Sequence, residues 1–376
     1  MLSAIPPYIL YTAAIVASTL VSIYSVRKIL AITTTLKIYD IPDDVRKIHG
    51  AGIPSLGGIG IFLGYILVAS FFWPGRPLSV GFFLTPTLLL FFTGVYDDLM
   101  NMSPLKKLIV QLAASAIPVY FANISIGSLC GMVGIEALPQ SVSLVITILG
   151  CTLFINAFNF IDGIDGLACV LAIIYALTLG LLFASLGALN LAILSFCVAG
   201  GTLGLLFYNF SPAKIYMGDT GSMLLGFTIF ILSVVYLHLN TAGAWIFTAR
   251  GRVPAEIIHS EKGALLVVLA ILFLPTFDAL RVFVLRLSKG RSPLRADRTH
   301  LHYYLLDAGC SHPQAVLIIA TINVIIIALA FLLQDMNPLI GFTCMLVLVT
   351  LSMVVVYLLR QKNLSKRSPV NGKLSV

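Results

Sequence analysis

Charged residues are scarce in this chain of 376 residues. They make up 10% of the sequence, whereas hydrophobic residues make up 59%; an ordinary soluble protein has roughly 25% charged residues. A soluble fold cannot bury so large an apolar fraction, so the composition predicts a polytopic integral membrane protein. Cysteine is also sparse: the six Cys show no C-x-x-C spacing, which excludes a disulfide scaffold and argues against structural zinc.

Long apolar runs fill most of the sequence. A hydrocarbon core about 30 Å thick needs roughly 20 helical residues, and this length predicts an all-α fold with eleven transmembrane spans. The expected spans are 6–26, 56–73, 80–96, 105–122, 141–158, 167–184, 188–208, 222–238, 263–283, 314–333 and 338–359. We expect one catalytic transmembrane domain over residues 1–359, followed by a basic cytoplasmic tail over 360–376.

Basic residues are distributed unequally between the two sides that eleven spans define. All but four of the 23 Lys and Arg fall on one side; the exceptions are Arg76, Arg250, Arg252 and Lys262. Because cytoplasmic loops carry the excess of Lys and Arg, we expect the N-terminus outside and the C-terminus in the cytoplasm. The net charge of +8 then reflects membrane orientation, and nucleic acid is not an expected partner.

Acidic residues gather in three motifs on the predicted cytoplasmic side. The motifs are GVYDDLMNMS with Asp97 and Asp98, NAFNFIDGIDGL with Asp162 and Asp165, and IYMGDTGSM with Asp219. Each carboxylate alone has a simpler explanation as the cap of a helix. Ionisable groups beside lipid are costly unless they are paired or bind a metal. Three motifs on one face therefore predict a shared acidic site for Mg²⁺ or Mn²⁺, because carboxylate oxygens suit these cations.

Basic and histidine residues supply the opposite charge on the same side. The segment RLSKGRSPLRADRTHLHYYLL contains Arg298, His300 and His302, and such side chains donate hydrogen bonds to phosphate oxygens. Part of this basic charge is explained as an orientation signal. Zinc binding by the two histidines is an alternative, although no third soft ligand lies nearby in the sequence.

Two further basic stretches belong to the same side. Lys107 lies one helical turn or more beyond Asp98 and can reach an anion at the acidic site. Lys47 and His49 precede a glycine-rich entry to the second span. We expect these residues to contribute to substrate binding. An acidic metal site beside a cationic phosphate clamp is what phosphoryl transfer requires.

Several motifs follow one another in a fixed order along the chain. They are KIHGAGIPSLGG (47–58), Asp97-Asp98, NAFNFIDGIDGL (156–167), MGDTGSM (217–223), a PTFD ending at Asp278, and DRTHLHYYLL (297–306). This ordered set resembles the polyprenyl-phosphate N-acetylhexosamine-1-phosphate transferases over about residues 35–310. The IPSLGG and HLH sequences are more similar to the branch that uses UDP-N-acetylglucosamine (UDP-GlcNAc) than to the muramoyl-pentapeptide branch.

The resemblance implies a reaction and a location. GlcNAc-1-phosphate is transferred from UDP-GlcNAc to undecaprenyl phosphate, which gives undecaprenyl-pyrophosphoryl-GlcNAc and UMP and initiates a cell-envelope glycan. The implied cofactor is Mg²⁺, for which Mn²⁺ substitutes. The implied location is the bacterial cytoplasmic membrane, with the active site facing the cytoplasm and membrane lipid around the spans. Family members are often dimeric, so a homodimer is a possible state.

The resemblance also assigns roles to residues of this chain. The assignments are Asp219 and Asn159 to the metal, Asp97 and Asp98 to the metal region or the lipid phosphate, Asp162 and Asp165 to the nucleotide, Lys107 to the pyrophosphate, and Arg298, His300 and His302 to a loop that covers the sugar and phosphates. The expected catalytic residues among them are Asp97, Asp98, Asp219, His300 and His302. The sequence departs from the family pattern at two positions. Tyr303 stands where relatives have a third histidine, and Ser55 stands where a basic residue is common.

Three alternatives to this function stay open. The first is the same reaction with another UDP-amino sugar or with phospho-MurNAc-pentapeptide. The second is a transporter, although the acids cluster at one face instead of mid-bilayer and no inverted repeat is evident. The third is a CDP-alcohol phosphotransferase, whose D-G-x-x-A-R signature is absent because Asp162-Gly163 is followed by Ile164-Asp165.

Overall fold

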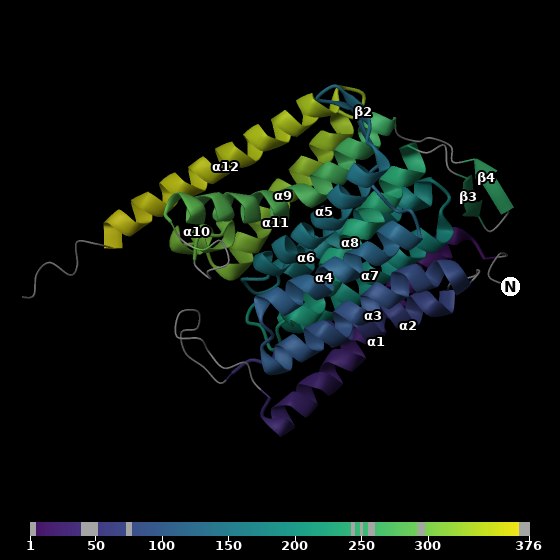
Figure 1. Cartoon of the computed structure of the whole chain (residues 1–376). Coiled ribbons are helices and arrows are strands. Elements are labelled where there is room, and N and C mark those ends of the chain that lie inside the picture. Colours follow the sequence, from purple (N-terminus) through teal and green to yellow (C-terminus); the bar gives the residue numbers. More distant parts are fainter. Residues whose placement is uncertain are drawn as a thin grey trace, which may run out of the picture.

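Helices form almost the whole of the computed structural model, which describes residues 5–38, 52–72, 77–241, 245–248, 251–254, 260–290, 292 and 298–367 (Figure 1). In chain order they are α1 (Pro7–Leu36), α2 (Gly58–Phe72), α3 (Pro77–Met100), α4 (Pro104–Phe121), α5 (Gln140–Ile161), α6 (Leu167–Ser185), α7 (Leu189–Asn209), α8 (Gly218–Thr241), α9 (Glu261–Ser288), α10 (Leu301–Asp307), α11 (His312–Leu332) and α12 (Pro338–Arg367). This content confirms an all-α polytopic membrane protein.

Each expected span coincides with one of these helices, and α10 is an additional short helix. Within the described residues, nine helices are long and apolar enough to cross a membrane, while α2 is shorter, at 15 residues. The number of spans, the orientation of the two ends and the domain bounds stay predictions. Lys47 and His49 lie outside the described residues.

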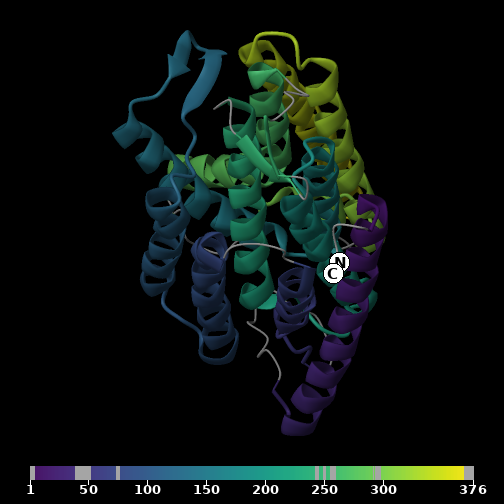
Figure 2. The same ribbon diagram turned by 90° about the vertical axis from the view of Figure 1, so that its right-hand side faces the viewer.

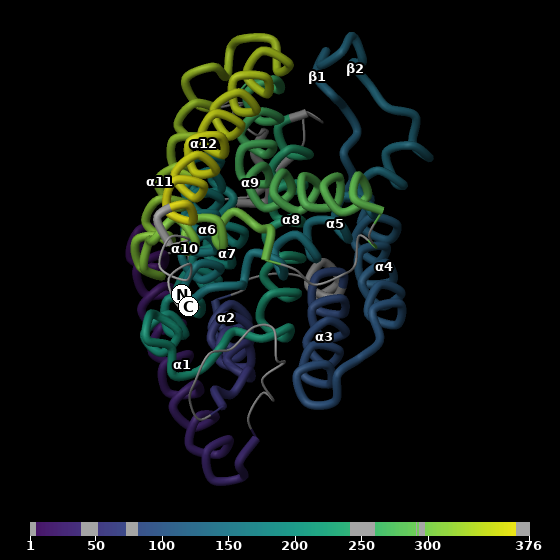
Figure 3. Tube along the Cα trace, turned by 90° about the vertical axis from the view of Figure 1, so that its left-hand side faces the viewer, coloured from purple at the N-terminus to yellow at the C-terminus, as the bar shows by residue number. Residues whose placement is uncertain are grey.

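Two short hairpins were not expected from the sequence. Strand β1 (Ser128–Met132) pairs antiparallel with β2 (Ile135–Ala137), and β3 (Trp245–Thr248) pairs with β4 (Gly251–Pro254). The first hairpin turns through Val133 and Gly134, which both have positive φ, as a two-residue type I′ turn requires. Figures 2 and 3 show β1 and β2 projecting at the same end of the molecule as the connection between α11 and α12.

Burial differs strongly between the helices. Helix α8 is the most enclosed, with 83% of its most apolar stretch buried, whereas the corresponding value for α12 is 22%. A helix that is apolar all round is suited to the centre of a bundle, where other helices contact every side. Helix α8 contacts α2, α3, α5, α6 and α9, so its N-terminal turn, which carries Asp219, is set by several neighbours at once.

Candidate active site

The N-terminus of α8 is held by the glycine-rich entry to α2. The backbone N–H groups of Gly57 and Gly58 donate to the carbonyls of Tyr216 and Met217, at 2.9 and 2.8 Å. Gly218 has a φ of +73°, and a Cβ there would lie 1.9 Å from a backbone oxygen of the α2 entry. Only glycine fits this close approach, which joins the IPSLGG and MGDTGSM motifs into one structural unit.

Asp98 caps helix α8 from the last turn of α3. Its Oδ1 accepts a hydrogen bond from the Asp219 N–H at 2.7 Å, and its Oδ2 accepts from the N–H and hydroxyl of Thr220, at 3.0 and 2.6 Å. These are the unsatisfied donors of a helix N-terminus, and a carboxylate is favoured there by the helix dipole. Asp98 therefore caps α8 and not α4, the next helix in the chain, and a catalytic role for it stays a prediction.

Lys107 lies between two carboxylates that come from different motifs. Its Nζ is 3.1 Å from Asp97 Oδ2 and 2.5 Å from Asp219 Oδ2. Asp97 is 8% exposed and also accepts a hydrogen bond from the Met102 N–H at 2.5 Å. The third predicted span ends at residue 96, but α3 continues to Met100 and carries Asp97 and Asp98 in its last turn.

Asn159 completes this group from the C-terminal end of α5. Its amide nitrogen donates to Asp219 Oδ1 and to the Ser222 hydroxyl, the latter at 2.7 Å. Helices α3, α4, α5 and α8 thus bring together five residues that the sequence had singled out. We call this group, Asp97, Asp98, Lys107, Asn159 and Asp219, the acidic cluster.

The donor atoms of the acidic cluster fit a hard divalent cation such as Mg²⁺. Asp97 and Asp219 already face one positive centre, the Lys107 ammonium, and the Asn159 amide adjoins Asp219. Within the described residues, no group of three or more His, Cys, Asp or Glu could hold a metal by itself. Mg²⁺ does not need such a cage, because it is bound by one or two carboxylates together with substrate phosphates and water.

The motif between α5 and α6 places its two acids in different surroundings. Burial, with the charges of Asp219 and Asp165 added, raises the pKa of Asp162 to about 7. Burial alone would raise the pKa of Asp165, but its pairing with His312 at 3.5 Å and a hydrogen bond from the Ala213 N–H lower the pKa overall. Asp162 is therefore close to the acidic cluster, whereas the contacts of Asp165 fix the loop before α8 and the start of α11.

Asp278 organises the segment that contains the two histidines. This buried residue of α9 is 2.8 Å from His300 Nδ1, accepts from the Leu301 N–H, and is paired with Arg281 at 2.7 Å. Arg281 also donates to the Thr299 carbonyl at 2.5 Å. Sequence reasoning placed Asp278 in a motif without giving it a role. The sequence signal that could have indicated its role is an acidic residue near the end of a span, three residues before Arg281.

His302 packs directly against the NAFNFIDGIDGL motif. Its side chain is fully buried, and a Cβ on Gly163 would lie 2.2 Å from its Nε2. The His302 ring stacks with that of His300 at a centroid distance of 5.7 Å, and His300 lies as close to Phe160. The loop histidines are therefore joined to the segment that carries Asn159 and Asp162.

Arg298 lies apart from these contacts. Its side chain is 45% exposed, and one guanidinium nitrogen is 3.7 Å from Asp307 Oδ1 at the end of α10. It also stacks over the ring of Tyr303. The arrangement leaves Arg298 accessible, and its predicted contact with substrate stays a prediction.

Comparison with known proteins gives the arrangement a family. The sequence profile described as glycosyl transferase family 4 matches residues 80–237. The chain is 31% identical to a probable undecaprenyl-phosphate N-acetylglucosaminyl 1-phosphate transferase of Bacillus subtilis, over 77% of this chain and 76% of that protein. The chain therefore belongs to glycosyl transferase family 4. It is also 34% identical to the decaprenyl-phosphate N-acetylglucosaminephosphotransferase of Mycobacterium tuberculosis, over 73% of this chain and 70% of that protein. A third relative is the undecaprenyl-phosphate alpha-N-acetylglucosaminyl 1-phosphate transferase of Escherichia coli K12, at 28% identity over 73% and 71%.

Membership of glycosyl transferase family 4 makes the chain a membrane enzyme of the sugar-1-phosphate transferase type. The profile match includes the whole acidic cluster, whereas Asp278, His300 and His302 lie beyond its end at residue 237. The structure nevertheless joins the two regions through the contact of His302 with Gly163. Both regions therefore belong to one candidate active site.

Proposed function

We propose that this enzyme transfers GlcNAc-1-phosphate from UDP-GlcNAc to undecaprenyl phosphate, with release of UMP and dependence on Mg²⁺. Three relatives whose names describe N-acetylglucosaminyl phosphate transfer to a prenyl phosphate support the substrate pair. We further propose that the site faces the cytoplasm of a bacterial inner membrane, with the N-terminus outside, because the basic residues predominate on the side of the acidic motifs.

One observation carries this proposal: the Lys107 ammonium contacts both Asp97 and Asp219, which are 122 positions apart in the sequence. The acidic cluster sets the carboxylates of Asp97 and Asp219 against a single lysine, so their oxygens retain negative charge that a divalent cation would neutralise. Asp219 and Asn159 would hold Mg²⁺ there, and the ion would supply positive charge to the phosphates during transfer.

The residues of the chain then have separate tasks. An oxygen of the acceptor phosphate forms a bond to the β-phosphorus of UDP-GlcNAc, and the bond from that phosphorus to the bridging oxygen breaks. UMP leaves with the electron pair, so no proton transfer is obligatory. Lys107 stabilises negative charge on the phosphates, Asp97 positions Lys107, and Asp98 fixes the helical turn that carries Asp219.

The histidine segment, residues 298–302, is proposed to close over the donor substrate. Asp278 holds the His300 ring because its carboxylate accepts a hydrogen bond from Nδ1, which leaves Nε2 for a polar partner. His302 sets the distance between this segment and the loop of Asp162 by packing on Gly163. Substrate phosphates and sugar would then lie between the acidic cluster and the histidine segment.

The direct test is turnover of purified protein with radiolabelled UDP-GlcNAc and undecaprenyl phosphate in detergent. We expect UMP release that stops in excess EDTA and returns with Mg²⁺. Asp219→Asn should lower turnover by more than about 100-fold, while the exposed Asp335→Asn serves as the charge-matched control. A rate for Asp219→Asn near that of the control, or full activity in EDTA, would contradict the proposal.

A further inference from the structure

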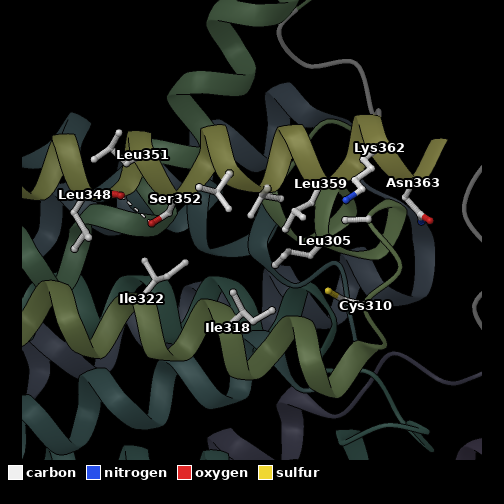
Figure 4. Close-up of a pocket in the computed structure, with 13 residues that line it drawn as sticks. Leu305, Cys310, Ile318, Ile322, Leu348, Leu351, Ser352, Leu359, Lys362 and Asn363 are labelled. Carbon is white, nitrogen blue, oxygen red and sulfur yellow. Dashed lines mark hydrogen bonds between the residues drawn. The ribbon is translucent and has the colours of Figure 1, made fainter. Parts of the chain in front are cut away.

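A groove that takes no part in the acidic cluster lies between α11 and α12 and ends at α10 (Figure 4). Its volume is about 570 Å³. Aliphatic side chains form most of its walls, for example Ile318 and Ile322 on α11 and Leu348 and Leu351 on α12. The one hydroxyl midway, that of Ser352, already donates to the Leu348 carbonyl at 2.8 Å. The middle of the groove is therefore apolar along its length and suits a hydrocarbon chain.

The end of the groove nearest α10 is different in chemistry. Lys362 and Asn363 line it together with Cys310, and Figure 4 shows the Lys362 ammonium directed toward the groove. The Asn363 amide donates to the Asp307 carbonyl at 2.9 Å, which fixes this side of the opening to α10. A cation thus stands at one end of an apolar groove.

The charge of Lys362 is not neutralised by its neighbours among the described residues. The nearby acid, Asp307, is paired with Arg360 at 2.8 Å and more loosely with Arg298 at 3.7 Å. No described Asp or Glu lies within ion-pair distance of Lys362. An uncompensated ammonium at the end of a membrane-spanning helix attracts the phosphates of anionic lipids.

We propose that this groove binds one anionic phospholipid, with an acyl chain along α11 and α12 and the phosphate at Lys362. Both helices have the length and hydropathy of membrane spans, and most of α12 is not covered by protein. A lipid in this position lies parallel to the helices, as in a bilayer, with its head group at the basic C-terminal end of α12. The acceptor lipid is disfavoured because its phosphate has to reach the acidic cluster on α3, α4, α5 and α8.

Native mass spectrometry of the full-length, delipidated protein tests the head-group contact. Phosphatidylglycerol and phosphatidylcholine with identical acyl chains are added separately, and the fraction of protein with one bound lipid is measured. We expect the anionic lipid to bind about fivefold more tightly, and Lys362→Gln to remove that preference. Lys28→Gln, which removes a lysine of α1 away from the groove, should keep it. Equal binding of the two lipids, or equal behaviour of the two variants, would overturn the proposal.

Two further measurements distinguish the occupants. Ser352→Trp fills the groove and should abolish the bound phosphatidylglycerol, whereas Leu332→Trp, at an 80% exposed position of α11, should not. In a Cys344→Ser background, Cys310 is the one cysteine that is not buried, and phosphatidylglycerol should slow its reaction with a small maleimide. The idea fails if undecaprenyl phosphate displaces phosphatidylglycerol one for one. It also fails if Ser352→Trp abolishes a dimer of the protein and leaves lipid binding unchanged, because the groove would then hold a second protein copy.

Discussion

Replacement of Asp98 by Ala separates a structural role from a chemical one. The carboxylate of Asp98 accepts two backbone N–H groups and one hydroxyl at the N-terminus of α8. Alanine would leave the N–H groups of Asp219 and Thr220 without partners in a part-buried position. The close crossing of α3 and α8, where a Cβ on Gly94 would lie 2.4 Å from Thr220 Cα, leaves little room for water to replace them.

The size of the effect follows from those hydrogen bonds. A buried N–H group that loses its acceptor costs about 1.5 kcal/mol, so leaving the two backbone donors without partners costs about 3 kcal/mol. The Thr220 hydroxyl can rotate to another acceptor and is left out of this figure. At about 2 °C per kcal/mol for a large domain, the melting temperature should fall by about 6 °C, and turnover should fall with it because Asp219 is displaced.

The assay is thermal unfolding of the purified protein in detergent, followed in parallel with UMP release. Asp98→Ala should lower the melting temperature and turnover together. The exposed Asp335→Asn controls for loss of an acid. If Asp98→Ala keeps the wild-type melting temperature and loses only turnover, the residue acts in catalysis and the capping argument is refuted.

Three other changes test the remaining contacts. Lys107→Gln should lower kcat by about 100-fold or more with a smaller effect on the KM for UDP-GlcNAc, measured by steady-state kinetics, because the lysine stabilises charge that develops during transfer; an unchanged kcat would contradict this. Gly163→Ala should lower turnover without preventing membrane insertion, because a methyl group would enter the space of the His302 ring; activity equal to wild type would show that the ring moves freely. Asp162 has a pKa of about 7 in the fold, above its unfolded value, so the folded state holds the extra proton and stability falls as pH rises from about 4 to 7. In EDTA, Asp162→Asn should therefore melt above wild type at pH 8 and like wild type near pH 4; a difference that does not vary with pH would refute the assignment.

Hydropathy predicted the helices well because burial in a bilayer is a property of each segment by itself. Every expected span coincides with a helix, but the ends differ: α1 continues to Leu36 and α3 to Met100, beyond the apolar runs. Polar residues can extend a helix outside the hydrocarbon, and hydropathy gives no signal for that continuation. Hydropathy also did not predict the short α10 and the two hairpins, because these elements are too small to show a membrane pattern.

The sequence alone determined the membrane class, the order of the motifs and the identity of most candidate site residues, because composition and motif spacing are written along one chain. Tertiary structure alone decided what those residues do to one another. It placed Lys107 between Asp97 and Asp219 and turned Asp98 into a helix cap. It also gave Asp278 its partner in His300. Such contacts join segments far apart in sequence, and their distances depend on how whole helices pack, which no local pattern encodes.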